Sequence, residues 1–135
     1  MEAVTIEDIH IQPGKLTARV RVAPDARRTD DRIARRVLHD HPDLARHSCV
    51  NDKGPAFASV IADTSVPHLL EHIVIDRQIA EEPPESRITF TGHTTWISED
   101  AGLASIVVNF RSDACALRAL AYACSYFDSV MKEEI

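Results

Sequence analysis

The sequence predicts a small α/β domain of the α+β type, a two-layer sandwich with helices packed on an antiparallel or mixed sheet. Apolar and polar residues alternate over residues 3–23, as in a hairpin of two strands. Residues 87–97 and 103–111 predict a second pair of strands, and helical periodicity follows each pair. A further helix lies between the two halves, which gives the order ββα, helix, ββα. We expect one domain over residues 1–135, because this length is close to the common domain size.

Composition narrows the class of protein. Hydrophobic residues make up 44% and charged residues 27%, which is ordinary for a globular domain. The formal net charge of −6 argues against general binding of nucleic acid. No apolar run approaches the roughly 18 residues that a membrane span needs, so we expect no membrane contact. Three cysteines without a disulfide-like spacing, and an acidic start without a signal peptide, predict a cytoplasmic protein.

The first half begins with a hairpin that turns at Pro13 and Gly14. Thr29 is the predicted cap of the next helix, which ends at Pro42 because the residue before a proline avoids helical geometry. Its buried stripe comprises Ile33, Ala34, Val37 and Leu38. Residues 51–55 are typical of a loop, and residues 57–61 predict a short helix.

The middle helix has clear boundary signals. Ser65 is a suitable N-terminal cap, Pro67 is tolerated in the first turn, and residues 81–84 (EEPP) end the helix. Its predicted core residues are Leu69, Leu70, Ile73 and Val74. Ser112 caps the last helix. The stripe predicted for that last helix comprises Leu117, Leu120, Ala121, Cys124, Phe127 and Met131.

The middle helix carries the pattern H-x-x-E-H in residues 68–72. His68 and His72 are four residues apart and therefore share a helix face, on the flank of the apolar stripe, with Glu71 nearly on the same side. Two such imidazoles can bind one Zn²⁺, and a glutamate beside the open position can act as general base. The alternative is a surface helix with two solvated histidines and an ordinary glutamate.

A catalytic zinc site needs a third protein ligand. Cys49 is the first choice, because a thiolate is a strong zinc ligand and Cys49 lies in the loop region upstream of the helix. The alternative for Cys49 is a small buried apolar side chain. His47, His93 and Glu99 are the other candidates. Asp76, four residues after His72, either accepts a hydrogen bond from a metal-binding histidine or is a solvated helix residue.

The stretch from His41 to Met131 resembles the N-terminal domain of cyanophycin synthetase. Residues 41–49 (HPDLARHSC) are similar to the family's Leu-Pro-x-Leu-x-x-His-x-Cys segment, and a glycine-containing loop follows in both. Residues 66–78 (VPHLLEHIVIDRQ) resemble the family helix that carries H-x-x-E-H-V-A-L-E-L-Q. A strand, a turn at Gly92, residues 98–102, a second strand and an alanine-rich helix then follow in the family's order.

The resemblance implies the small α/β fold of that domain and a metallopeptidase-like zinc site. His68, His72 and Cys49 would then be zinc ligands and Glu71 the base. In some synthetases this domain is thought to bind the Asp-Arg polymer and to cleave it into primers. This chain departs from the family pattern at residues 76 and 77, where Asp-Arg replaces Glu-Leu, and at His93, where the family often has a Gly-Lys or Gly-Arg turn. It has no room for the ATP-grasp or Mur-ligase-like modules, so we do not expect a synthetase.

Two functions therefore remain open. The first is a zinc-dependent, metallopeptidase-like hydrolase of peptide or isopeptide bonds, with a peptide or a cyanophycin-like Asp-Arg polymer as substrate and Glu71 as base. The second is a non-catalytic module that binds a peptide, a polymer or a protein partner and holds a structural metal or none. A homo-oligomer is compatible with both. A third possibility is a structural dimer in which the H-x-x-E-H pattern is accidental.

Overall fold

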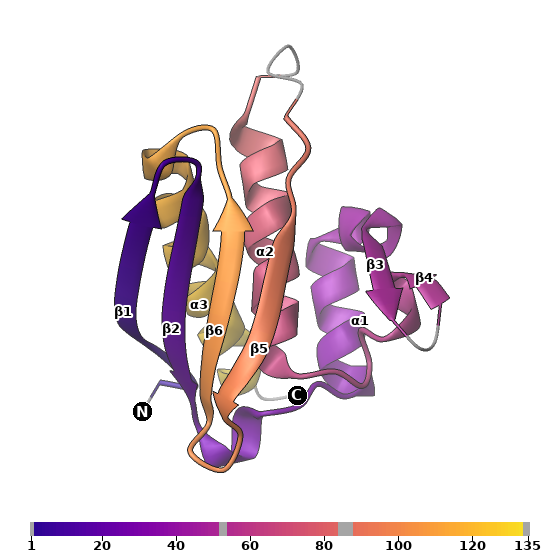
Figure 1. The fold of residues 1–135 in the computed structure, drawn as a ribbon. Coiled ribbons are helices and arrows are strands. Elements are labelled where there is room, and N and C mark those ends of the chain that lie inside the picture. The colour runs from indigo at the N-terminus through magenta and orange to yellow at the C-terminus, as the bar shows by residue number, and fades with distance from the viewer. Residues whose placement is uncertain (1, 52–53, 84–87, 134–135) are drawn as a thin grey trace.

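The structure is a computed structural model that describes residues 2–51, 54–83 and 88–133. Its main element is an antiparallel sheet with the strand order β1-β2-β6-β5 (Figure 1). The strands are β1 (Val4–Gln12), β2 (Lys15–Val22), β5 (Gly92–Ser98) and β6 (Leu103–Asn109). The predicted fold class is confirmed, and the sheet is antiparallel rather than mixed.

Helices cover one face of this sheet. Within the described ranges the α-helices are α1 (Asp31–Asp40), α2 (Val66–Glu81) and α3 (Asp113–Lys132). Helices α2 and α3 lie against the sheet, and α1 lies beside them, away from it (Figure 1). A small hairpin of β3 (Ser48–Asn51) and β4 (Gly54–Ala56) lies on the same side as α1. None of the helices in the described part of the chain is long and apolar enough to cross a membrane.

The alternation in the strands separates a buried face from an open one. Leu16, Ala18, Val20 and Val22 of β2 are buried against the helices, while Arg19 and Arg21 point to the open face. Strand β6 repeats the pattern with Ala104, Ile106 and Val108. Gly14 turns the β1–β2 hairpin with a φ of 74°, a conformation that glycine adopts without steric strain. The predicted hairpin is therefore confirmed.

The cap of α1 differs from the prediction. Asp30, not Thr29, caps the helix, and its carboxylate accepts a hydrogen bond from the backbone N–H of Ile33 at 2.8 Å. Thr29 is buried, and its hydroxyl accepts a bond from the backbone N–H of Thr64 at 2.9 Å. Tertiary contact with the segment before α2 thus takes the side chain of Thr29 and leaves the capping to its neighbour.

Three further features differ from the prediction. Part of the predicted loop at residues 51–55 forms the β3–β4 hairpin, while residues 52 and 53 lie outside the described residues. Strand β5 begins at Gly92, five residues later than predicted. The buried face of α3 also differs from the predicted stripe, and several of its buried residues are small. Its buried residues are Cys115, Ala116, Ala119, Leu120, Ala123, Cys124, Phe127 and Val130, whereas Leu117 and Ala121 are exposed.

Candidate metal centre

Helix α2 supplies most of the candidate site. Ser65 caps it as predicted, since the Ser65 hydroxyl accepts a hydrogen bond from the backbone N–H of His68 at 3.2 Å. The helix lies between the sheet and α3 on one side and the β3–β4 hairpin on the other. Both flanks are therefore covered, and His72 and Glu71 are only 4% and 5% exposed. The sequence placed the two histidines on the flank of the apolar stripe, but it did not indicate how deeply His72 is buried.

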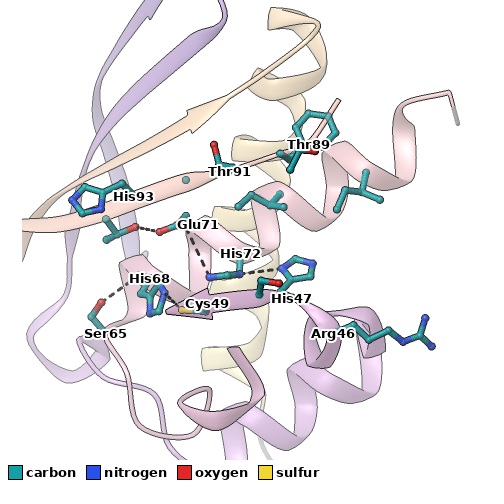
Figure 2. Close-up of a pocket in the computed structure, with 16 residues that line it drawn as sticks. Arg46, His47, Cys49, Ser65, His68, Glu71, His72, Thr89, Thr91 and His93 are labelled. Atoms are coloured by element: carbon teal, nitrogen blue, oxygen red, sulfur yellow. Dashed lines mark hydrogen bonds and ion pairs between the residues drawn. The ribbon is translucent and has the colours of Figure 1, made fainter. Parts of the chain in front are cut away.

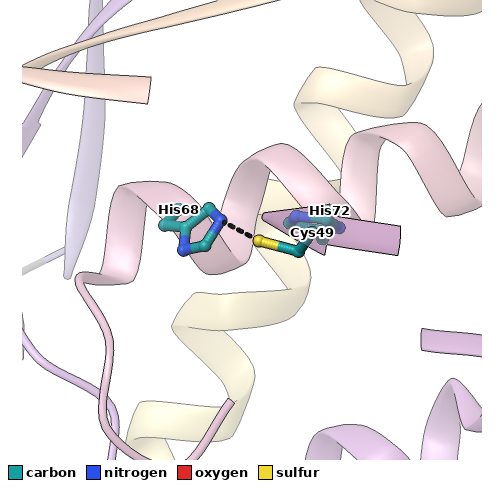
Figure 3. A group of neighbouring side chains, drawn as sticks. All are labelled: Cys49, His68 and His72. Atoms are coloured by element: carbon teal, nitrogen blue, oxygen red, sulfur yellow. Dashed lines mark hydrogen bonds between the residues drawn. The ribbon is translucent and has the colours of Figure 1, made fainter. Parts of the chain in front are cut away.

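Cys49, His68 and His72 converge into a group that could hold a metal ion. One ligand atom from each lies within 4.8 Å of the others. The Cys49 sulfur lies 3.4 Å from Nε2 of His68 (Figure 3). One sulfur and two imidazole nitrogens form a donor set that suits zinc and related divalent metals. Residues from β3 and α2 thus meet across 19 positions of sequence.

Neighbouring side chains hold the two imidazoles in place. The Thr64 hydroxyl lies 2.9 Å from Nδ1 of His68, which leaves Nε2 directed toward Cys49. Phe57 is fully buried, stacks on His72 at 3.9 Å between ring centroids, and meets His68 edge-on at 5.1 Å. Such supports set ring orientation and restrict the tautomer in metal sites.

A chain of polar contacts extends from His72 away from this group. Nδ1 of His72 lies 3.0 Å from Nδ1 of His47, and Nε2 of His47 lies 3.6 Å from Asp76. Asp76 also lies 3.3 Å from His41, whose Nε2 is 2.7 Å from the Tyr122 hydroxyl. The side chain of Asp76 is therefore only 14% exposed, and it faces His41 and His47. It reaches His72 through His47.

Glu71 is positioned by β5. The Thr94 hydroxyl donates a hydrogen bond of 2.7 Å to Oε1 of Glu71, and Oε2 lies 3.9 Å from Nε2 of His72. Gly92 lies against the same side chain, because a Cβ at that position would be 2.8 Å from Oε2 and from Cγ of Glu71. The strand thus leaves space for the carboxylate and orients it toward His72.

Burial sets the charge of these groups. Burial, together with nearby His68 and His47, lowers the pKa of His72 to about 3. Burial also lowers the pKa of His68. Neutral imidazoles are the form that binds a metal. Burial raises the pKa of Glu71, although the hydrogen bond from Thr94 opposes this shift. For Asp76, burial raises the pKa, but contacts with His41 and His47 outweigh it and hold the pKa well below its usual range.

The group opens into a pocket of about 800 Å³ between α2, β5 and the β3–β4 side (Figure 2). This volume is in the usual range for small-ligand sites, roughly 300–1,000 Å³. His47 and His93 line the pocket, but the group of three does not include them. Glu99 lies in the turn between β5 and β6 and does not line it.

Sequence reasoning missed several side chains around the site. Phe57, Thr64 and His41 gave no signal, because their roles depend on contacts between distant segments. Thr94 could have been found, since alternation along residues 92–98 places it with Trp96 on the buried side of the strand. Gln78 is fully buried, and its amide donates a hydrogen bond of 3.1 Å to the backbone carbonyl of Asn109. Cys115 and Cys124 are buried packing residues, as predicted.

Comparison with protein families matches residues 26–132 to the cyanophycin synthase-like N-terminal domain. The chain belongs to this family. The match includes the H-x-x-E-H helix and Cys49, and it extends beyond the resemblance at residues 41–131 to include α1. A search of curated proteins gave no match.

The cyanophycin synthase-like match leaves out the β1–β2 hairpin, which ends at Val22. That hairpin nevertheless pairs with β6 inside the matched region, from Lys15 opposite Asn109 to Arg21 opposite Leu103. All residues of the candidate metal group and of its pocket nevertheless lie within the matched region.

Proposed function

We propose that this protein is a zinc-dependent hydrolase of peptide or isopeptide amide bonds. The observation that supports this most is the convergence of Cys49, His68 and His72 beside a buried glutamate in a large pocket. In this proposal the three residues hold Zn²⁺, and Glu71 acts as general base. When bound, zinc polarises the scissile carbonyl and makes water more acidic.

The chain's own residues account for the proton transfers. The oxygen of a water molecule adds to the carbonyl carbon of the amide, and Glu71 accepts a proton from that water. Glu71 then delivers the proton to the amide nitrogen as the C–N bond breaks, which leaves a carboxylic acid and an amine, and the acid releases its proton to solvent. The Thr94 hydroxyl keeps one oxygen of Glu71 occupied, so the other is available for the transfer. The raised pKa of Glu71 makes it a stronger base than an exposed glutamate.

Metal content and turnover test the proposal together. We expect about one zinc per chain in the purified protein by elemental mass spectrometry, and loss of that zinc in the double variant His68→Ala/His72→Ala. Glu71→Gln should keep the metal and abolish hydrolysis of whichever substrate the unmodified protein cleaves, a peptide or soluble Asp-Arg polymer. Absence of metal from the unmodified protein, even after zinc is added, would overturn the proposal. Loss of the metal in Glu71→Gln would show that Glu71 is not the base.

A further inference from the structure

Strand β5 forms a free edge of the sheet. It pairs with β6 on one side, and no strand in the described part of the chain pairs with its other side. The backbone N–H of Asn109 donates to the carbonyl of Thr91 at 3.2 Å, and Gly92 lies opposite Val108. In an antiparallel ladder this makes Thr91, His93 and Thr95 the residues bonded to β6. The N–H and C=O groups of Gly92 and Thr94 therefore point away from β6.

This alternation agrees with the other side of β6. The backbone N–H of Val22 donates to the carbonyl of Gly102 at 2.8 Å, so even-numbered residues of β6 bond to β2. The odd-numbered residues Ser105 and Val107 are thus left for β5, opposite Thr95 and His93. The assignment of the outward groups to Gly92 and Thr94 follows from both ladders.

The outward groups lie beside the candidate metal centre. Gly92 and Thr94 both line the pocket, and both contact Glu71. Figure 2 shows β5 passing along the pocket next to Glu71, with His68, His72 and Cys49 on the other side of that carboxylate. A peptide bonded to this edge would consequently run past the residues that the proposed function assigns to catalysis.

The remaining lining of the pocket indicates which side chains fit. Beyond Glu71 an apolar surface is formed by Ile75, Ile79 and Phe90, and Ile79 is 53% exposed. Glu71 is the only carboxylate among the described lining residues, and Arg46 is the only cation other than histidine. An arginine side chain would find no free carboxylate here, whereas an apolar side chain would bury the exposed surface of Ile79.

We propose that the pocket binds an extended α-peptide that adds a strand to the free edge of β5. The main chain of the peptide pairs with the N–H and C=O groups of Gly92 and Thr94, and an apolar side chain packs on Ile75, Ile79 and Phe90. Strand addition of this kind obtains affinity from the main chain and specificity from alternate side chains. The fate of the bound peptide rests on the proposed function, but its binding does not.

Amide hydrogen exchange tests the binding mode directly. The probe is an N-acetylated, C-amidated hexapeptide of alanine with one central leucine, added to the zinc-loaded Glu71→Gln variant and to the metal-free unmodified protein. Saturating peptide should slow exchange of the Gly92 and Thr94 amides by roughly tenfold or more. The His93 and Thr95 amides, already bonded to β6, should change little. Equal protection of all four amides, or of none, would overturn the proposal.

The peptide side offers a matched test. N-methylation at alternate positions removes one main-chain donor at a time, so affinity should fall at every second position only. Replacing the central leucine by arginine or aspartate should weaken binding roughly tenfold, equivalent to about 1.4 kcal/mol. Loss of affinity at every position, or tighter binding of the arginine peptide, would contradict strand addition or the apolar subsite, respectively.

Two isoleucines provide a matched control on the protein. Ile79 and Ile97 are both 53% exposed, but only Ile79 lines the pocket. Ile79→Lys should weaken the leucine peptide, and Ile97→Lys should not. An equal effect of both variants would overturn the proposal.

If peptides were hydrolysed without protection of the Gly92 and Thr94 amides, the binding mode would fail while the proposed hydrolase function would stand. If those amides were protected but no peptide were hydrolysed, the binding mode would stand and the proposed hydrolase function would fail.

Discussion

Among single residues, Gly92 shows how closely the strand approaches the carboxylate of Glu71. A side chain at Gly92 would begin 2.8 Å from Glu71, closer than ordinary contact allows. The carboxylate is the mobile end of its side chain, so it can move without disrupting the fold. The bare backbone at Gly92 therefore serves the placement of Glu71 rather than a turn. A substitution at Gly92 therefore tests the position of Glu71 without changing any of the three candidate metal ligands.

We expect Gly92→Ala to displace Glu71 and to lower hydrolysis by roughly a hundredfold or more, because general acid–base catalysis depends on geometry. Zinc content should stay near one per chain, since the three atoms nearest to a Cβ at Gly92 all belong to Glu71. Turnover and elemental mass spectrometry measure the two effects. Thr95→Ala, at an exposed neighbouring position, is the control. Normal turnover in Gly92→Ala would show that Glu71 does not need its present position.

Asp76 should support the metal through His47. Asp76→Asn removes the negative charge that faces His47 and His41. Loss of a direct partner of a metal ligand lowers metal affinity about 10–100-fold, and because Asp76 acts through His47 we expect a loss at the lower end, about tenfold. Zinc affinity can be measured by competition with a chelating dye. Tyr122→Phe removes the other partner of His41 and should disturb the same cluster without this loss of affinity. A fall in thermal stability without any change in zinc affinity would restrict Asp76 to a structural role.

At the scale of elements, the stability of helix α2 and the position of His68 depend on the same cap, because Ser65 bonds to the backbone N–H of His68. Ser65 and Ser112 cap α2 and α3 with the same side chain and the same hydrogen bond to the third residue onward. Ser65→Ala and Ser112→Ala should each lower the free energy of unfolding by about 1 kcal/mol. Only Ser65→Ala should also weaken zinc binding, because it loosens the turn that carries His68. Urea unfolding and dye competition distinguish the two effects, and equal zinc affinities in both variants would contradict the coupling.

The sequence was sufficient to predict α2 and the residues it carries. Its periodicity, its cap at Ser65 and the prolines near both ends are local signals that the tertiary structure does not override. The proximity of Cys49 to His68 was a hypothesis from residue chemistry. It could not be derived from spacing, because strands β3 and β4 have four and three residues, too few for a periodic pattern.

The deep burial of His72 was missed for the same reason. Phe57, which stacks on His72, belongs to a segment whose position is set by its backbone bond to His47 and not by local propensity. Likewise, Asp76 lies at the expected distance along α2, but the structure places His47 between it and His72. The part of the site that sequence periodicity does not predict thus consists of contacts between α2 and side chains from other segments.

For the whole molecule, the buried imidazoles couple the fold to pH. The folded pKa of His72 lies at about 3, against an ordinary value of 6.5, and that of His68 is also lowered. When the pH falls below 6.5, the unfolded chain binds protons that the folded chain does not, so the free energy of unfolding decreases. Glu71 has the opposite sign, because its raised pKa makes the folded chain take up a proton first. Two histidines, and Asp76 with its lowered pKa, oppose one glutamate, so destabilisation should dominate.

We therefore expect the metal-free protein to lose stability, on the order of a few kcal/mol, between pH 6.5 and pH 4. Urea unfolding in the presence of a chelator at a series of pH values measures this loss. His72→Gln should flatten the dependence, because it removes the group with the larger shift, whereas His39→Gln at an exposed position should not. Added zinc should raise stability most near neutral pH and least in acid, because protons and metal compete for the same imidazoles. A stability that did not change with pH in this window would mean that His72 is solvated, and the buried site described here would be wrong.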